Sequence, residues 1–188
     1  MNLEKYQQSI SRLEGQHKAH QTQYDSTVGQ LAQLKVAQEA AEKALVLAQT
    51  VAQQTQQELE FRISDIVTSS LASVFDDPYE FKVRFDIKRG KTEAALLFTR
   101  DGMEIDPMTA SGGGVIDIAT FALRIACYLI SSPRPAPVML FDEPSKYLSE
   151  RYRSSFADLL TNMSSKLGIQ FIFVTHCPDY EVGNIITL

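Results

Sequence analysis

Two adjacent carboxylates follow a short apolar segment in the C-terminal third of the chain. Residues 138–141 are apolar, and Asp142 and Glu143 come directly after them. A carboxylate at the C-terminal end of a buried strand in an α/β sheet points into the crevice where ligands bind. In phosphoryl transfer Asp142 would orient Mg²⁺, and Glu143 would polarise the attacking water. The alternative is a strand that ends in a solvated acidic turn.

A histidine stands at the corresponding place one strand-helix-strand unit later. Residues 169–174, a predicted buried strand, are followed by Thr175 and His176. If the two strands are neighbours, their C-terminal ends meet, and His176 lies close to Glu143. There it could hydrogen-bond a γ-phosphate and the attacking water. A lone histidine after a strand can equally be structural or simply exposed.

A glycine-rich turn opens the apolar helix that precedes both segments. Ser111 could cap this helix, and Gly112, Gly113 and Gly114 would let backbone N–H groups approach an anion closely. The helix dipole would add to the attraction. The alternative is a flexible turn before a core helix.

The order of these three features resembles the C-terminal half of an ABC ATPase. Residues 110–114 stand at the signature motif, residues 138–143 at Walker B with the catalytic glutamate, residues 144–149 at the D-loop, and His176 at the switch histidine. Preceded by a coiled coil, this half resembles the SMC branch, which includes the SbcC-type DNA-break repair ATPases. The resemblance covers residues 60–188 by the order of the motifs.

The resemblance implies a function and a set of roles. Two heads would dimerise around ATP: Ser111 and the three glycines would bind nucleotide, Asp142 would support Mg²⁺, and Glu143 and His176 would be catalytic. The implied partners are an N-terminal lobe, a second head, DNA and an SbcD-type nuclease. A non-catalytic protein that docks on an SMC-like ATPase as regulator or decoy is the alternative.

At several positions of the signature motif and the D-loop the sequence departs from the family pattern, so the contacts of these residues do not follow from the resemblance. Ala110 and Gly114 replace the usual leucine and the usual glutamine or glutamate, and Ser149 stands where aspartate is frequent. Lys146 and Tyr147 are bulkier than the usual small pair.

The phosphate-binding loop that such a site needs is missing from the sequence. Residues 89–92 read Arg-Gly-Lys-Thr, but the spacing to an earlier glycine fails, and the stretch lies in a predicted hairpin turn. The missing lobe therefore belongs to a separate chain or to an absent part of this one, and the chain alone should hydrolyse no ATP. A solvated hairpin or a basic patch for DNA phosphates would explain the cationic residues here: Arg84, Lys88, Arg89, Lys91 and Arg100.

The first 66 residues are polar and contain no proline. Their apolar residues recur at alternating spacings of three and four, which predicts a coiled-coil helix. It could be a dimerising or docking helix, or one limb of an antiparallel arm. One seam position holds Leu3, Ile10, Tyr24, Leu31, Leu45, Ala52, Leu59 and Ile66, and the other holds Tyr6, Leu13, Leu34, Ala41 and Ala48.

Residues 67–188 alternate between strand and helix patterns. Strands are expected at 79–87, 92–100, 138–141 and 169–174, and helices from the glycine turn to about Ser131 and from Ser149 to a cap at Gly168. This order predicts an α/β fold: the C-terminal lobe of an ABC-type head, with a mostly parallel sheet, flanking helices and a β-hairpin. The expected domains are a coiled-coil helix at 1–66 and this lobe at 67–188.

Bulk properties exclude several classes of protein. The net charge of −5 argues against a surface that binds nucleic acid all over. Cys127 and Cys177 form no CxxC pair, so no zinc site is encoded. Two free thiols and no signal peptide favour the cytoplasm, and no apolar run is expected to span a membrane.

Overall fold

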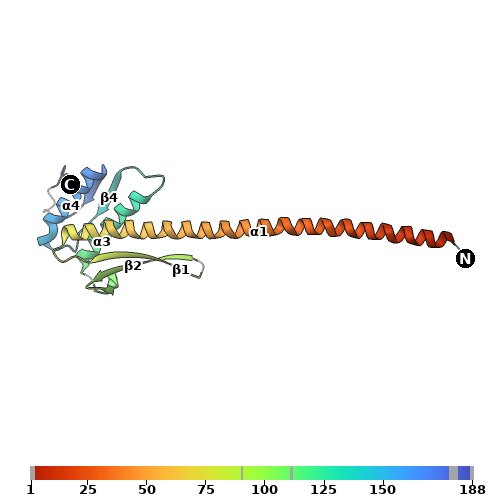
Figure 1. Ribbon diagram of the computed structural model, residues 1–188. Coiled ribbons are helices and arrows are strands. Elements are labelled where there is room, and N and C mark those ends of the chain that lie inside the picture. The colour runs from red at the N-terminus through yellow and green to blue at the C-terminus, as the bar shows by residue number, and fades with distance from the viewer. Residues whose placement is uncertain (1–2, 90, 111, 178–181, 187–188) are drawn as a thin grey trace. The chain divides into compact units, whose positions relative to one another are not determined.

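The computed structural model describes residues 3–89, 91–110, 112–177 and 182–186 (Figure 1). The chain divides into two compact units, residues 1–53 and 54–188. Helix α1, Leu3–Val74, contributes to both of them. The expected domain boundary after Ile66 remains a prediction.

The first unit is helical throughout its described residues. No proline interrupts it, and polar and alanine-rich sequence favours the helix. Every described side chain is exposed, including the large apolar residues of the predicted seam, such as Leu31, Leu34 and Leu45. An isolated helix gains no burial from such side chains, so the seam is available to a partner helix.

The last turns of α1 belong to the core of the second unit. Ile63, Val67, Leu71 and Val74 are buried along one face, at the spacing that a helix requires. The helix stops at Val74, where the sequence Asp-Asp-Pro follows within four residues.

The backbone N–H groups of an edge strand need hydrogen-bond acceptors, and polar side chains of α1 supply them for β1. Strand β1, Glu80–Lys88, lies alongside the helix. The N–H of Phe81 donates to Thr68 Oγ1 (2.9 Å), that of Val83 to Ser64 Oγ (3.1 Å), and that of Phe85 to Glu60 Oε1 (2.7 Å). Three acceptors spaced four apart on the helix thus match three donors spaced two apart on the strand. Four residues of a helix rise about 6.0 Å and two residues of a strand about 6.6 Å, so each acceptor lies opposite its donor.

The β-hairpin has the expected antiparallel form. Strand β1 pairs with β2, Lys91–Arg100, and a turn at residues 101–102 leads to a third short strand, β3, Met103–Ile105. A four-residue helix, α2, Pro107–Ala110, follows. Neither β3 nor α2 was expected, because segments this short carry little periodicity.

The remaining elements form a strand-helix-strand unit with a preceding helix. Helix α3, Gly113–Ile130, leads to β4, Val138–Asp142. A 3₁₀ turn, η1 (Glu150–Tyr152), and α4, Arg153–Leu167, then cross over to β5, Gln170–Val174, which pairs with β4 in parallel. The predicted cap at Gly168 is confirmed, with φ 64° and an N–H that donates to Ser164 O (2.9 Å).

A cluster of phenylalanines holds the parallel strands to the helices. Phe121 of α3 lies with its ring centroid 4.9 Å from that of Phe141, 5.3 Å from that of Phe156 and 5.7 Å from that of Phe171. These residues come from α3, β4, α4 and β5, so one face of the strand pair is covered by both helices.

The predicted α/β fold class is confirmed, with the hairpin and the parallel crossover in their expected places. The expectation of a mostly parallel sheet is wrong for the described residues: β1, β2 and β3 pair antiparallel in one sheet, and only β4 and β5 pair in parallel. Another expectation is corrected: α3 is long and apolar enough, by length and composition, to cross a membrane. Its packing gives another reason for that composition, because Ile118, Phe121 and Ile125 are buried in the core.

Candidate functional site

The C-terminal ends of β4 and β5 lie side by side, as their spacing predicts. Asp142 pairs with Val174, and the N–H of Glu143 continues the ladder by donating to Val174 O (2.9 Å). Glu143 adopts a left-handed backbone conformation, with φ 46°. This conformation costs about 1–3 kcal/mol for a non-glycine residue and tends to occur at functional sites.

The carboxylate of Glu143 is held by the residues that follow β5. Its Oε1 accepts a hydrogen bond from the backbone N–H of His176 (2.7 Å), and its Oε2 accepts one from Thr175 Oγ1 (3.4 Å). A carboxylate has about four lone-pair positions, so acceptor capacity remains. The side chain is 26% exposed, which leaves it within reach of water.

The imidazole of His176 points away from the core. Its side chain is 97% exposed, and Nε2 lies 3.9 Å from Glu143 Oε1. The structure therefore joins His176 to Glu143 through the backbone amide and leaves the ring available to a ligand.

Asp142 offers a free hard-oxygen donor at the end of β4. Its side chain is exposed and makes no hydrogen bond or ion pair with the described residues. Within the described part of the chain no three potential ligands cluster to form a complete metal site. Mg²⁺ is commonly held by one or two carboxylates together with substrate phosphates and water, so a single carboxylate here fits that ion.

The glycine turn lies at the start of α3, with one correction to its cap. The N-cap residue is Gly112, in extended conformation and without a side-chain cap, whereas capping by Ser111 was expected. Ser111 itself lies outside the described residues. Nothing lies within 4 Å of the position that a Cβ of Gly112 would occupy, so its backbone is open to a ligand.

Gly113 and Gly114 are required for a different reason, which is steric. A Cβ on Gly113 would lie 2.7 Å from Tyr147 Cβ, and one on Gly114 would lie 3.0 Å from Tyr147 O and 3.1 Å from Leu148 Cα. Both glycines are therefore needed for the close approach of the 143–149 loop. The order of the motifs predicted that this loop belongs to the site. It did not reveal the contact with the glycines, because that contact joins residues far apart in the sequence.

A cavity of about 360 Å³ lies beside this contact. The glycine turn and residues 147–149 form part of its lining, and Arg100 and Arg151 add positive charge. Arg100 is engaged by the Asp77 carboxylate (3.5 Å) and stacks over Tyr79, with its Cζ 3.7 Å from the ring centroid.

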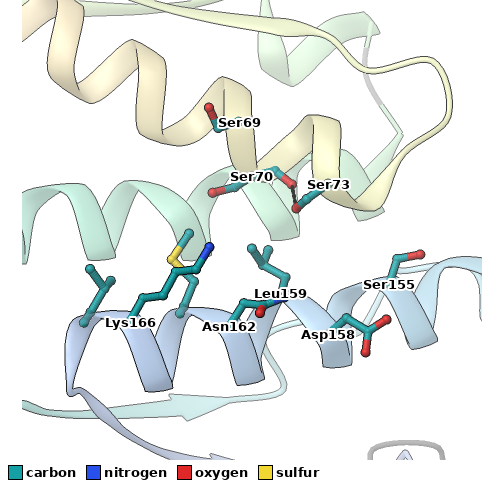
Figure 2. Close-up of a pocket in the computed structure, with 10 residues that line it drawn as sticks. Ser69, Ser70, Ser73, Ser155, Asp158, Leu159, Asn162 and Lys166 are labelled. Carbon is teal, nitrogen blue, oxygen red and sulfur yellow. Dashed lines mark hydrogen bonds between the residues drawn. The ribbon is translucent and has the colours of Figure 1, made fainter.

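A second cavity, of about 320 Å³, lies between the end of α1 and α4. Figure 2 shows Ser70 and Ser73 of α1 opposite Asn162 and Lys166 of α4. It is lined by none of the predicted site residues and so lies apart from the Glu143 site.

The cationic hairpin is partly neutralised by its own neighbours. Arg84 lies 3.5 Å from the carboxylate of Asp86 and 3.7 Å from that of Glu104. Lys91 begins β2 and pairs with Lys88 of β1, so Arg89, Lys91 and Thr92 lie in the predicted hairpin and not between a strand and a helix.

Comparison with known proteins identifies what this arrangement is similar to. No family model matches the chain. The DNA double-strand break repair Rad50 ATPase of Archaeoglobus fulgidus is 29% identical over 94 residues, which are 50% of this chain and 10% of that protein. The chain resembles the C-terminal portion of an SMC-like ABC ATPase. It spans about a tenth of the length of this relative.

Solved SMC-type heads are similar at a lower level. The SMC head domain from Thermotoga maritima has a TM-score of 0.45 and 21% identity, over 63% of this chain and 39% of that chain. The Smc head domain from Pyrococcus furiosus, bound to the C-terminal domain of ScpA, has the same score and identity over 63% of this chain and 29% of that chain.

Proposed function

We propose that the chain is the C-terminal lobe of an SMC-like ATPase, which binds and hydrolyses ATP at a head-head interface when an N-terminal lobe supplies the phosphate loop. One observation carries the proposal: the Glu143 carboxylate is fixed by Thr175 and His176 where two parallel strands end. Ligands bind at this edge of parallel sheets. The similarity to a Rad50 ATPase supports the same conclusion.

The residues of the chain divide the work between two places. Glu143 takes a proton from the attacking water, and the His176 ring, exposed beside it, hydrogen-bonds the phosphate. Asp142 supports Mg²⁺, and Mg²⁺-ATP supplies the phosphoryl group. Ser111 and the glycines, whose first member has open space before it, receive the nucleotide of the second head.

The bare face of the parallel strands supports the need for another lobe. Leu140 is 70% exposed and Val174 60%, and Val138 and Ile172 of the same face are exposed as well. In the described part of the chain β4 and β5 pair only with each other. Parallel sheets are normally covered on both faces, so this apolar face suits a lobe with strands or helices of its own.

The biological setting is a proposal that the similarity to the Rad50 relative supports. The Rad50 relative is named for DNA double-strand break repair. We propose that this chain acts on DNA in repair, recombination or chromosome maintenance, in the cytoplasm, with an SbcD-type nuclease as a further partner. The exposed seam of α1 would pair with the opposing limb of a coiled coil.

The test is reconstitution with a phosphate-loop lobe. The mixture should hydrolyse ATP, and Glu143→Gln should abolish turnover while ATP still induces dimers of the head. Glu150→Gln, at an exposed position in η1, is the matched control and should retain full activity. Unchanged hydrolysis by Glu143→Gln would overturn the proposal. An ATP-independent complex without hydrolysis would instead favour a regulator or decoy that docks on an SMC-like ATPase.

A further inference from the structure

Asp117 is an acidic residue inside the most apolar helix of the chain. It lies one turn after the start of α3, next to the buried Ile118. Burial raises the pKa of its carboxyl above the usual value, although a backbone hydrogen bond counteracts the effect. A carboxylate that is costly to bury needs a partner that accounts for its position.

The partner of Asp117 is the backbone of the loop after β4. Asp117 Oδ2 accepts a hydrogen bond of 2.8 Å from the N–H of Tyr147. An ionised acceptor makes such a bond stronger than a neutral one. The bond joins the first turns of α3 to a residue 30 positions later in the chain.

The same loop contacts both halves of the candidate site. It begins at Glu143, whose carboxylate is fixed at the end of β5, and at Tyr147 it packs against Gly113 and Gly114. A turn hydrogen bond keeps the loop compact, since the N–H of Lys146 donates to Glu143 O (3.3 Å). Only four peptide units separate Tyr147 from Glu143, so we expect a movement at Tyr147 to reach Glu143.

We propose that Asp117 is a positioning residue that couples the glycine turn to Glu143 by holding the Tyr147 amide. The inference rests on the proposed function and deepens it. In a head-head dimer the glycine turn faces the nucleotide of the second head, while Glu143 faces that of its own. Asp117 thus links the two nucleotides through one loop, without touching either.

A positioning role for Asp117 predicts a loss of kcat without a change in KM, and a rescue by asparagine. A residue that only stabilises the fold would not produce this combination. Asn at position 117 keeps an oxygen acceptor for the Tyr147 amide, whereas Ala and Ser do not reach it. In the reconstituted ATPase, Asp117→Ala should lower kcat by about 10- to 100-fold, because a displacement of the order of 1 Å has such an effect. KM for ATP should change little, since Asp117 touches no nucleotide, and Asp117→Asn should restore kcat.

The coupling can be measured without ATP, in the full 188-residue chain. Amide hydrogen exchange at Tyr147 should accelerate about tenfold or more in Asp117→Ala, with NMR shift changes at both Gly112–Gly114 and Glu143. Asp117→Asn should return both toward the original values, and Asp158→Ala, at an exposed position in α4, should leave them unchanged. Asp117→Ser serves the same purpose if the alanine variant does not fold.

The outcomes separate this inference from the proposed function. Unchanged Tyr147 exchange, or shift changes confined to one of the two places, would overturn the coupling. If the exchange and shift results are as expected but the reconstituted wild-type protein hydrolyses no ATP, the proposed function fails and the coupling stands.

Discussion

The backbone amide of His176 donates a 2.7 Å hydrogen bond to Glu143 Oε1, while the His176 ring lies in solvent. The two residues are therefore connected through the main chain, and the imidazole is not needed to hold the carboxylate. This separates the structural role of position 176 from any chemical role of its side chain.

Replacing His176 with alanine should affect chemistry and spare the fold. The backbone N–H that supports Glu143 remains, and the lost ring is 97% exposed. We expect the free energy of unfolding to stay within about 0.5 kcal/mol of the original. ATP hydrolysis in the reconstituted protein should fall by about 100-fold or more. Steady-state assays and urea unfolding measure the two effects, with His20→Ala in α1 as control. A loss of stability with normal turnover would contradict the assignment.

The bare face of β4–β5 predicts where the second lobe binds. Leu140→Glu places a charge on that face at a position that is 70% exposed, so the isolated chain should keep its stability within about 0.5 kcal/mol. Affinity for the phosphate-loop lobe should fall by more than about tenfold, because the charge would be buried without a partner. Met108→Glu, at an exposed position in α2, should leave affinity unchanged. Equal binding by the two variants, measured by calorimetry, would exclude this face.

The sequence predicted the elements that carry strong periodicity and the residues that end them. The helix that the heptads predict, the alternation of β1 and the glycine cap of α4 are local features, and each was found where expected. The meeting of Glu143 with Thr175 and His176 was also predictable, since a strand-helix-strand unit brings two strand ends together.

Contacts between distant segments could not be predicted in the same way. The bond from Tyr147 to Asp117 and the fit of Gly113 against Tyr147 depend on how α3 meets the loop, which no spacing encodes. Asp117 itself left one signal, a lone carboxylate in an apolar helix. The glycines were interpreted only as an anion site, because a need for small size is visible only when the neighbour is known.

The second glycine of the turn can be tested separately from the first. Alanine at position 113 would bring its Cβ to 2.7 Å from Tyr147 Cβ, an atom too close to the backbone to move freely. We expect Gly113→Ala to destabilise the lobe by about 1–3 kcal/mol, as overpacking does. Gly112→Ala should cost less than Gly113→Ala, because nothing lies within 4 Å of its Cβ position and its φ of −66° is accessible to alanine. Equal unfolding midpoints for the two variants would show that the loop yields easily.

The polar ladder between α1 and β1 predicts a specific cost for losing one acceptor. Thr68→Val keeps the shape of the side chain but leaves the Phe81 N–H, now bonded at 2.9 Å, without its acceptor. Thr68 is only half-buried, so we expect a loss of about 1 kcal/mol in the free energy of unfolding. Thr161→Val, at an exposed position in α4, removes a hydroxyl that bonds only its own helix and should be nearly neutral. Equal effects would show that the hydroxyl of Thr68 does not support the strand.

The half-buried carboxyl of Asp117 should make stability depend on pH in a defined direction. Burial raises its pKa in the folded state above the ordinary 3.8, so ionisation is less favourable in the folded chain than in the unfolded one. The stability that this group contributes is fully present below the unfolded pKa and is lost as pH rises through the folded pKa. Asp117→Asn keeps the acceptor for Tyr147 and does not titrate, so its stability relative to wild type should increase over that pH window. Urea unfolding at a series of pH values measures the difference, with Asp158→Asn as the exposed control. A wild type that gains stability over Asp117→Asn as pH rises would show that the hydrogen bond, and not burial, dominates this carboxyl.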